Sequence, residues 1–392
     1  MSTSFRVSIN AELLIWAIDN SGYELQDVAS SVGVSLETLL SWRSGESMPT
    51  WRQLKALANK TGRPVAAFYL PSPPDVPRRL RDFRTYPGAV LGHFSPELRK
   101  LIRQARSLRE QALELFDTLE EPPEFPDLPF FKIRDSVTDC ADTLRNFVGI
   151  TVDQQLAWPG EHVALNAWRE ILFDEGVFVV QLAIDKREAR GFSDNYDRLN
   201  LIAVSAQEDY PCARIFSVFH EVCHLCLRKA GVSDPRSYVE EGGHHATVER
   251  FCDRVAGAFL VPVENKVVRT LLQRVVASGR VDLDELKRAS GRLKVSQSAI
   301  LYRMVEARLI EQADYHDILA YWQDRGLPDK RKIKVRVARR RVASLGKRYA
   351  QMVMSALDSG SISSHEASSL LGARPRWLSE IRAEAYLGVT YG

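Results

Sequence analysis

The stretch FSVFHEVCHLCL, residues 216–227, constrains the fold of this chain more than any other feature. On an α-helix, residues four positions apart project from the same face, so His220 and His224 can direct their imidazole rings toward one metal ion. Glu221 is rotated by about 100° from His220, so its carboxylate can reach a water beside the metal without occupying the metal. The spacing predicts a helix that carries two zinc ligands and a general base.

A third ligand is expected downstream, because catalytic zinc uses three protein ligands and keeps one position for water. The stretch HATVERFCDRVAGAFLVP, residues 245–262, supplies Glu249 on a second predicted helix. Asp253 lies four residues further along the same face, where it can accept the outer N–H of a ligand histidine. We therefore expect Zn²⁺, with Mn²⁺ as the alternative, on His220, His224 and Glu249.

Two other interpretations compete with a zinc site. The histidines could occur by chance on a buried helix, although the downstream acidic pair disfavours this. Cys223 and Cys226 form a Cys-x-x-Cys, but they lie inside the predicted helix and not at its N-terminus, where thiolate pKa values are lowered. A Cys₂His₂ site would need a second ligand pair, and the adjacent His244 and His245 suit one ligand better than two. We interpret the cysteines as small buried packing residues.

A chain of 392 residues exceeds one ordinary core, so several domains are expected. The apolar runs at 176–184 and 199–205 are rich in β-branched residues and predict two strands, whereas most of the remainder has helical periodicity. The predicted fold class is α+β and mostly helical. The expected division is a helix-turn-helix domain, a linker with a connecting helix, a metallopeptidase domain with a small sheet, and a helical C-terminal region: residues 1–71, 72–130, 131–266 and 267–392.

The stretch LQDVASSVGVSLETLLSWRSG, residues 25–45, has the layout of a helix-turn-helix, with Gly33 in the turn and Ser35 as the N-cap of the second helix. DNA contacts would come from a few polar and basic side chains: Ser35, Glu37, Thr38, Ser41, Arg43 and Arg52. Residues 1–70 carry six basic and six acidic residues, so this segment lacks the excess of positive charge that marks a DNA-binding surface. Operator DNA is therefore expected to be bound by a homodimer, or with help from residues 330–341, which hold eight basic residues and no acid. Protein–protein docking is the other interpretation.

Composition gives no sign of export or membrane insertion. The N-terminus lacks a basic start followed by an apolar core, and no run approaches 18 uncharged apolar residues. Five cysteines in such a chain predict reduced thiols and a cytoplasmic location. The net charge of +3 identifies no partner.

On the His-Glu-x-x-His helix and E-x-x-C-D-x-V-A-G-A-F-L-V-P, the chain resembles the ImmA/IrrE family of metallo-endopeptidases. WRSGESMPTWRQLKALA resembles the XRE, or lambda-repressor-like, helix-turn-helix, and DFRTYPG is similar to segments that connect these modules. The resemblance covers most of residues 8–310. It implies a zincin-like domain with zinc on His220, His224 and Glu249 and with Glu221 as general base. Asp253 stands where the family usually has Asn, and Val-Cys stands where the motif more often reads Leu-Gly.

The resemblance implies a zinc-dependent endopeptidase that acts as a transcriptional or stress-response regulator by cleaving a partner such as a repressor. The alternative is a non-proteolytic regulator or antitoxin whose peptidase-like domain binds a partner protein such as a toxin. Oxyanion donors are expected in the loop after the motif, from Tyr238, His244 or His245. The strand at 199–205 is predicted to pair with an extended substrate by strand addition.

Overall fold

The computed structural model describes residues 5–74, 94–120, 124–185, 188–227, 242–277, 279–325 and 335–387, with the backbone alone at 242–246 and 323–325. The chain divides into two compact units: Met1–Arg79 with Val90–Gln104, and Leu80–Ala89 with Ala105–Gly392. The described residues are mostly helical with one small three-stranded sheet, which agrees with the predicted α+β class. None of the described helices is both long enough and apolar enough to cross a membrane.

The first unit is a cluster of short helices around Leu14, Leu39, Trp42, Leu54 and Phe68. Between α2 and α3, Gly33 adopts the left-handed conformation (φ 77°), and Ser35 accepts a hydrogen bond from the Thr38 N–H, as an N-cap should. The turn and the cap lie where the sequence predicts them. The helices of this unit are α1 (Ala11–Asp19), α2 (Leu25–Val32), α3 (Leu36–Arg43), α4 (Trp51–Thr61) and the 3₁₀ helix η1 (Val65–Tyr69).

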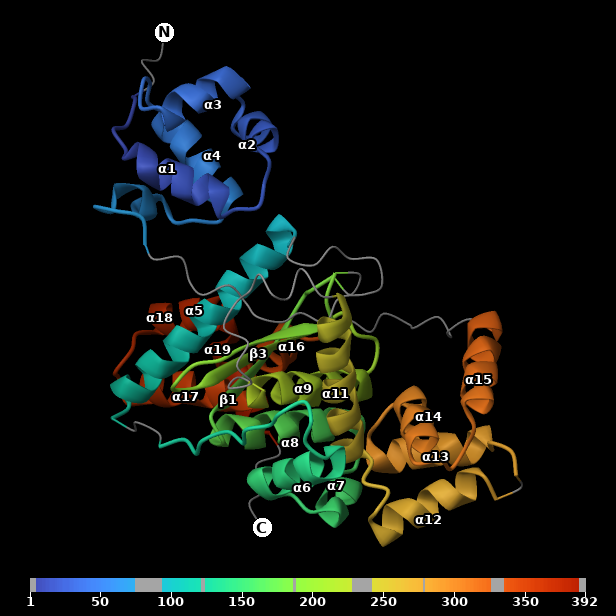
Figure 1. Ribbon diagram of the computed structural model, residues 1–392. Helices are drawn as coiled ribbons and strands as arrows, with labels where there is room; N and C mark the ends of the chain where they lie inside the picture. The colour runs from blue at the N-terminus through green and yellow to red at the C-terminus, as the bar shows by residue number, and fades with distance from the viewer. Residues whose placement is uncertain are drawn as a thin grey trace. The chain divides into compact units, whose positions relative to one another are not determined.

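The second unit holds the sheet, the motif helix and the C-terminal helices (Figure 1). The boundary between the units falls within α5 (Pro96–Thr118). The elements that build the site are α6 (Val137–Val148), α7 (Val152–Ala157), α8 (Glu161–Asp174), β1 (Val177–Leu182), β2 (Gly191–Asp194), β3 (Asn200–Ser205), α9 (Pro211–Cys226) and α11 (Gly242–Leu260). The elements that follow are α12 (Lys266–Val275), α13 (Leu283–Leu293), α14 (Gln297–Glu306), α15 (Gln312–Arg325), α16 (Val337–Leu345), α17 (Lys347–Asp358), α18 (Ser364–Leu370), η2 (Pro375–Trp377) and α19 (Leu378–Tyr386).

The sheet has the strand order β1-β3-β2. β1 pairs with β3 in parallel, with Val177 opposite Asn200, whereas β2 pairs with β3 antiparallel, with Gly191 opposite Val204. β1 and β3 match the two predicted strands. β2 was not predicted from the sequence, because GFSD is short and lacks the β-branched run that marks a strand. β3 is paired with β1 on one side and with β2 on the other, so the prediction that an extended substrate pairs with it is wrong.

Both faces of the sheet are covered, which explains why β1 and β3 read as continuous apolar runs. Alternate residues point to opposite faces. Val177 and Val179 belong to the large core that includes Trp168 of α8 and Phe219 of α9. Phe178, on the other face, stacks on Tyr349 of α17 with ring centroids 5.6 Å apart. The C-terminal helices therefore form part of the layer that covers this second face of the sheet.

Arg169 of α8 ties the end of α16 to β1. Its buried guanidinium donates to the carbonyl oxygens of Val179, Ala343 and Ser344 at distances between 2.6 and 3.1 Å. The last carbonyls of a helix have no partner within that helix, so a buried cation satisfies them and complements the helix dipole. Burial lowers the pKa of Arg169 to about 10, which leaves the side chain charged at neutral pH.

Candidate metal centre

Helix α9 carries the His-Glu-x-x-His motif through the middle of the core. It begins with Pro211 in the first turn, where a missing N–H costs nothing. His220, Glu221 and His224 are 0%, 1% and 5% exposed, because α8, α11 and the sheet surround the helix. Polar groups buried to this degree need partners. The partners of these three residues define the site.

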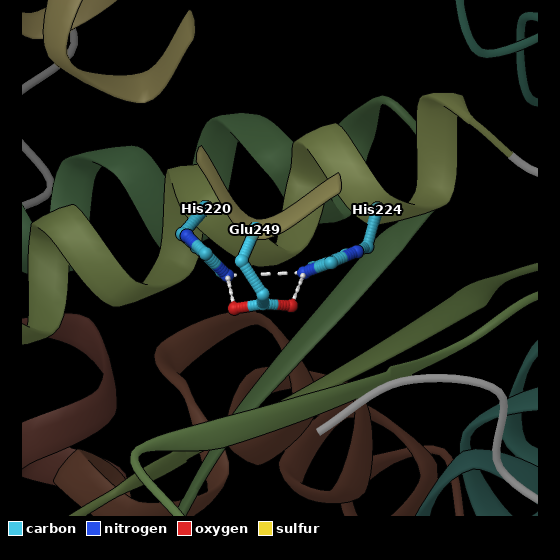
Figure 2. A group of neighbouring side chains, drawn as sticks. All are labelled: His220, His224 and Glu249. Carbon is cyan, nitrogen blue, oxygen red and sulfur yellow. Dashed lines mark hydrogen bonds and ion pairs between the residues drawn. The ribbon is translucent and has the colours of Figure 1, made fainter. Parts of the chain in front are cut away.

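Three ligand atoms converge on one point, as Figure 2 shows. The Nε2 atoms of His220 and His224 are 3.0 Å apart, and the Glu249 oxygens lie 3.3 Å from Nε2 of His220 and 3.2 Å from Nε2 of His224. Ligands about 2.0–2.1 Å from a tetrahedral zinc ion would be separated by about 3.3 Å. The spacing therefore fits a zinc-sized ion. The structure brings together the three residues that the sequence selected, and this group can hold a metal ion.

Asp253 fixes the orientation of the first histidine. Its Oδ1 lies 2.9 Å from Nδ1 of His220. With an ion bound at Nε2, the proton of His220 would stay on Nδ1, which would donate it to this carboxylate and so keep the ring oriented. Burial lowers the pKa of His220, but the hydrogen bonds with Asp253 and Glu249 outweigh burial, and the pKa is raised overall. Asp253 lies where the sequence predicts the outer partner of a ligand histidine.

Glu249 is a carboxylate that remains ionised although most of it is buried. Burial raises its pKa, but the hydrogen bonds and charges of His220 and His224 overcome burial and hold the pKa well below the ordinary value. An anionic oxygen ligand beside two neutral imidazoles is one of the donor sets that zinc takes in hydrolytic sites. The electrostatics of the site agree with its spacing.

Glu221 lies beside the ligands and is held by the sheet. Its Oε2 accepts a 2.8 Å hydrogen bond from Oγ of Ser193, on β2. A Cβ atom at Gly191 would lie 2.9 Å from the carbonyl oxygen of Ala203 and 3.3 Å from Oε1 of Glu221, so only glycine permits this approach of β2. Burial raises the pKa of Glu221, and the two histidines and Ser193 oppose that rise without cancelling it. Sequence reasoning missed Ser193, because nothing marks a serine in an unpredicted strand.

The thiols lie around the second histidine and outside the ligand cluster. Sγ of Cys252 is 3.6 Å from Nδ1 of His224. Cys223 and Cys226 are fully buried, and burial raises the pKa of Cys223 far above its ordinary value. Within the described part of the chain, the group with metal-ligand spacing contains no cysteine. This arrangement agrees with the interpretation of the cysteines as packing residues.

The remaining site predictions have mixed outcomes. Tyr238 lies outside the described residues, as do the side chains of His244 and His245. On α3, Ser35 and Thr38 hydrogen-bond to each other, Ser41 donates to the Thr38 carbonyl, and Arg43 lies 3.4 Å from Asp19. Glu37 and Arg52 are exposed. Most of the predicted DNA-contacting side chains on α3 therefore already have partners within their own unit.

Comparisons with models of known protein families, with curated proteins and with solved structures find no match to this chain.

Proposed function

We propose that this protein is a zinc-dependent endopeptidase of the ImmA/IrrE type, linked to a DNA-binding helix-turn-helix domain and acting as a transcriptional or stress-response regulator. The observation that carries the proposal is the convergence of His220, His224 and Glu249, with Glu221 buried beside them. Two histidines four apart on one helix and an acid on a second helix form the ligand set of a hydrolytic zinc site. Asp253 adds the outer contact such a set requires.

The chemistry divides between the ion and the chain. A bound zinc ion supplies Lewis acidity and lowers the pKa of a water toward neutrality. Glu221, on the turn that carries His220, accepts the proton of the attacking water and returns it to the departing amine nitrogen. Its burial beside His220 and its hydrogen bond to Ser193 hold the carboxylate in place for this exchange. Ser193 donates a hydrogen bond to Oε2 of Glu221, which leaves Oε1 to accept the proton.

The geometry of β2 supports an extended protein segment as substrate. Among the described strands β2 lies at one edge of the sheet, and Gly191 and Ser193 place it against Glu221. A peptide that adds to the outer edge of β2 would gain main-chain hydrogen bonds and present its carbonyl groups next to the general base. This assignment replaces the central strand β3, and it suits a partner protein such as a repressor with an exposed loop or tail.

The test separates metal binding from catalysis. Glu221→Gln should retain zinc and fold but lose hydrolysis of a fluorescence-quenched peptide library, because a general base contributes about 10²–10⁴-fold. Glu249→Ala should lose zinc as well. Wild-type protein that binds no zinc after gentle purification would refute the proposal. Equal regulatory activity of wild type and Glu221→Gln on a reporter promoter would favour the non-proteolytic regulator.

A further inference from the structure

The C-terminal helices carry the positive charge of this protein. Residues 335–387 contain nine basic and four acidic residues, a net charge of +5, whereas the remainder of the chain contains 44 basic and 46 acidic residues, a net charge of −2. Positive charge concentrated in one small segment is the electrostatic signature of a nucleic-acid contact. The question is whether these helices also have a shape that fits nucleic acid.

Helices α18 and α19 are joined by the same turn as α2 and α3. Gly372 adopts the left-handed conformation (φ 55°), and the N–H groups of Gly372 and Ala373 donate to the carbonyls of Ser369 and Ser368. Gly33 and Val34 donate to Ser30 and Ala29 in the same pattern, which is the Schellman motif. In both places the second helical segment begins three residues after the glycine, at Leu36 and at Pro375.

The packing positions also correspond. Five residues before the glycine, Val28 and Ala367 are fully buried, and nine residues after it, Trp42 and Ile381 are buried. These are the positions at which the two helices of a helix-turn-helix contact each other and the helix behind them. α19 packs against α16 and α17, which supply that support. Residues 364–386 thus share the turn and the buried positions of the first helix-turn-helix.

Arginines that have no acidic partner among the described residues lie around this motif. Arg336, Arg339 and Arg340 of the α16 N-terminus and Arg374 and Arg376 before α19 are exposed, and the described part of the chain offers none of them an acidic partner within 4 Å. The guanidinium of Arg341 lies 3.4 Å from where a Cβ of Gly372 would be, so the α16 arginines and the turn are neighbours. By contrast, Arg348 and Arg382 of the same helices pair with Asp174 and Asp358.

The α16 arginines also oppose the stability of their own helix. The first turn of α16 contains no acid and no side-chain cap, and cations at this end repel the positive end of the helix dipole. Arg169 anchors the opposite end, about 13 Å away by helix geometry. Phosphate groups beside Arg336 and Arg339 would remove this repulsion.

We propose that α16–α19 form a duplex-DNA-binding surface, in which α19 is the recognition helix and the α16 arginines contact phosphates. The first helix-turn-helix has no Arg or Lys between Ser35 and Trp42, whereas Arg374 and Arg376 directly precede α19. This inference does not rest on the peptidase proposal, because none of its residues belongs to the metal centre.

The test compares two full-length variants with the same change in charge. Arg339→Gln, Arg340→Gln, Arg374→Gln and Arg376→Gln are combined in one variant. The control combines Arg348→Gln and Arg382→Gln with Lys347→Gln and Arg288→Gln, all of which remove ion-paired cations. Binding of a fluorescent 30-base-pair DNA duplex is measured by anisotropy from 50 to 300 mM salt. The thermal midpoint establishes that the first variant is folded.

The first variant should bind at least about tenfold more weakly than wild type at 100 mM salt, and the slope of log affinity against log salt should fall by about 2 to 4. The control should stay within about threefold of wild type. Equal binding by wild type and the first variant would overturn the proposal, and so would equal losses in both variants or no binding by wild type. Tighter binding of a double-stranded RNA of the same length would also overturn it, in favour of an RNA surface.

Discussion

Replacing Asp253 by asparagine should weaken zinc binding. The asparagine side-chain oxygen can still accept from Nδ1 of His220, so the ring keeps its orientation. The substitution removes the negative charge of the carboxylate, whose Oδ1 lies 2.9 Å from that nitrogen. A hydrogen bond to a charged group contributes about 1 kcal/mol more than a neutral one, which corresponds to about a fivefold loss of zinc affinity. Asp253→Ala removes the contact and should lower the zinc affinity about 10–100-fold.

The assay is competition for zinc between the protein and a chromogenic chelator at pH 7.5, so no substrate is required. Glu264→Gln serves as the control, because that acid is half exposed and pairs with Arg303 away from the ligands. The expected order of affinity is wild type, then Asp253→Asn, then Asp253→Ala. Zinc bound by Asp253→Ala as tightly as by wild type would refute the argument, because it would mean that the outer contact of His220 does not support the metal.

Three further outcomes follow from contacts of the same unit. Ser193→Ala removes a hydrogen bond that stabilises the ionised form of Glu221, so its pKa rises, and the acid limb of the pH–rate profile of peptide hydrolysis should move to higher pH. Arg169→Met leaves buried carbonyl groups without donors and should lower the free energy of unfolding by about 3 kcal/mol in urea titrations. Gly191→Ala should reduce hydrolysis more than zinc binding, because the added methyl group presses on Glu221 and on Ala203 but not on the ligands.

The sequence pointed to the three residues that the structure brings together, because the chemistry of a metal site constrains their spacing. His220 and His224 must share one helix face to reach the same ion. Glu249, followed by Asp253 four residues later, predicts a second helix that supports them. The helix predicted for the motif is α9 (Pro211–Cys226), and the two apolar runs are β1 and β3. Patterns of this kind depend on near neighbours along the chain, which a sequence shows directly.

The residues that were missed act across long separations. Ser193 reaches Glu221 from 28 positions away, and it does so from a strand whose four residues have no strand-like composition. Arg169 contacts carbonyl groups more than 170 residues later, and an isolated arginine on a predicted helix gives no sign of such a role. The central position of β3 could not be foreseen either, because it depends on β2.

The buried thiols around His224 can report whether the metal centre is occupied. Cys223, Cys226 and Cys252 are fully buried, so an alkylating reagent reaches them only when the region opens. A ligand that binds the closed state alone makes opening rarer, in proportion to its concentration relative to its dissociation constant. The rate of thiol modification should therefore slow as zinc is added, and it reads out occupancy of the centre without a substrate, a spectroscopic metal or an added label.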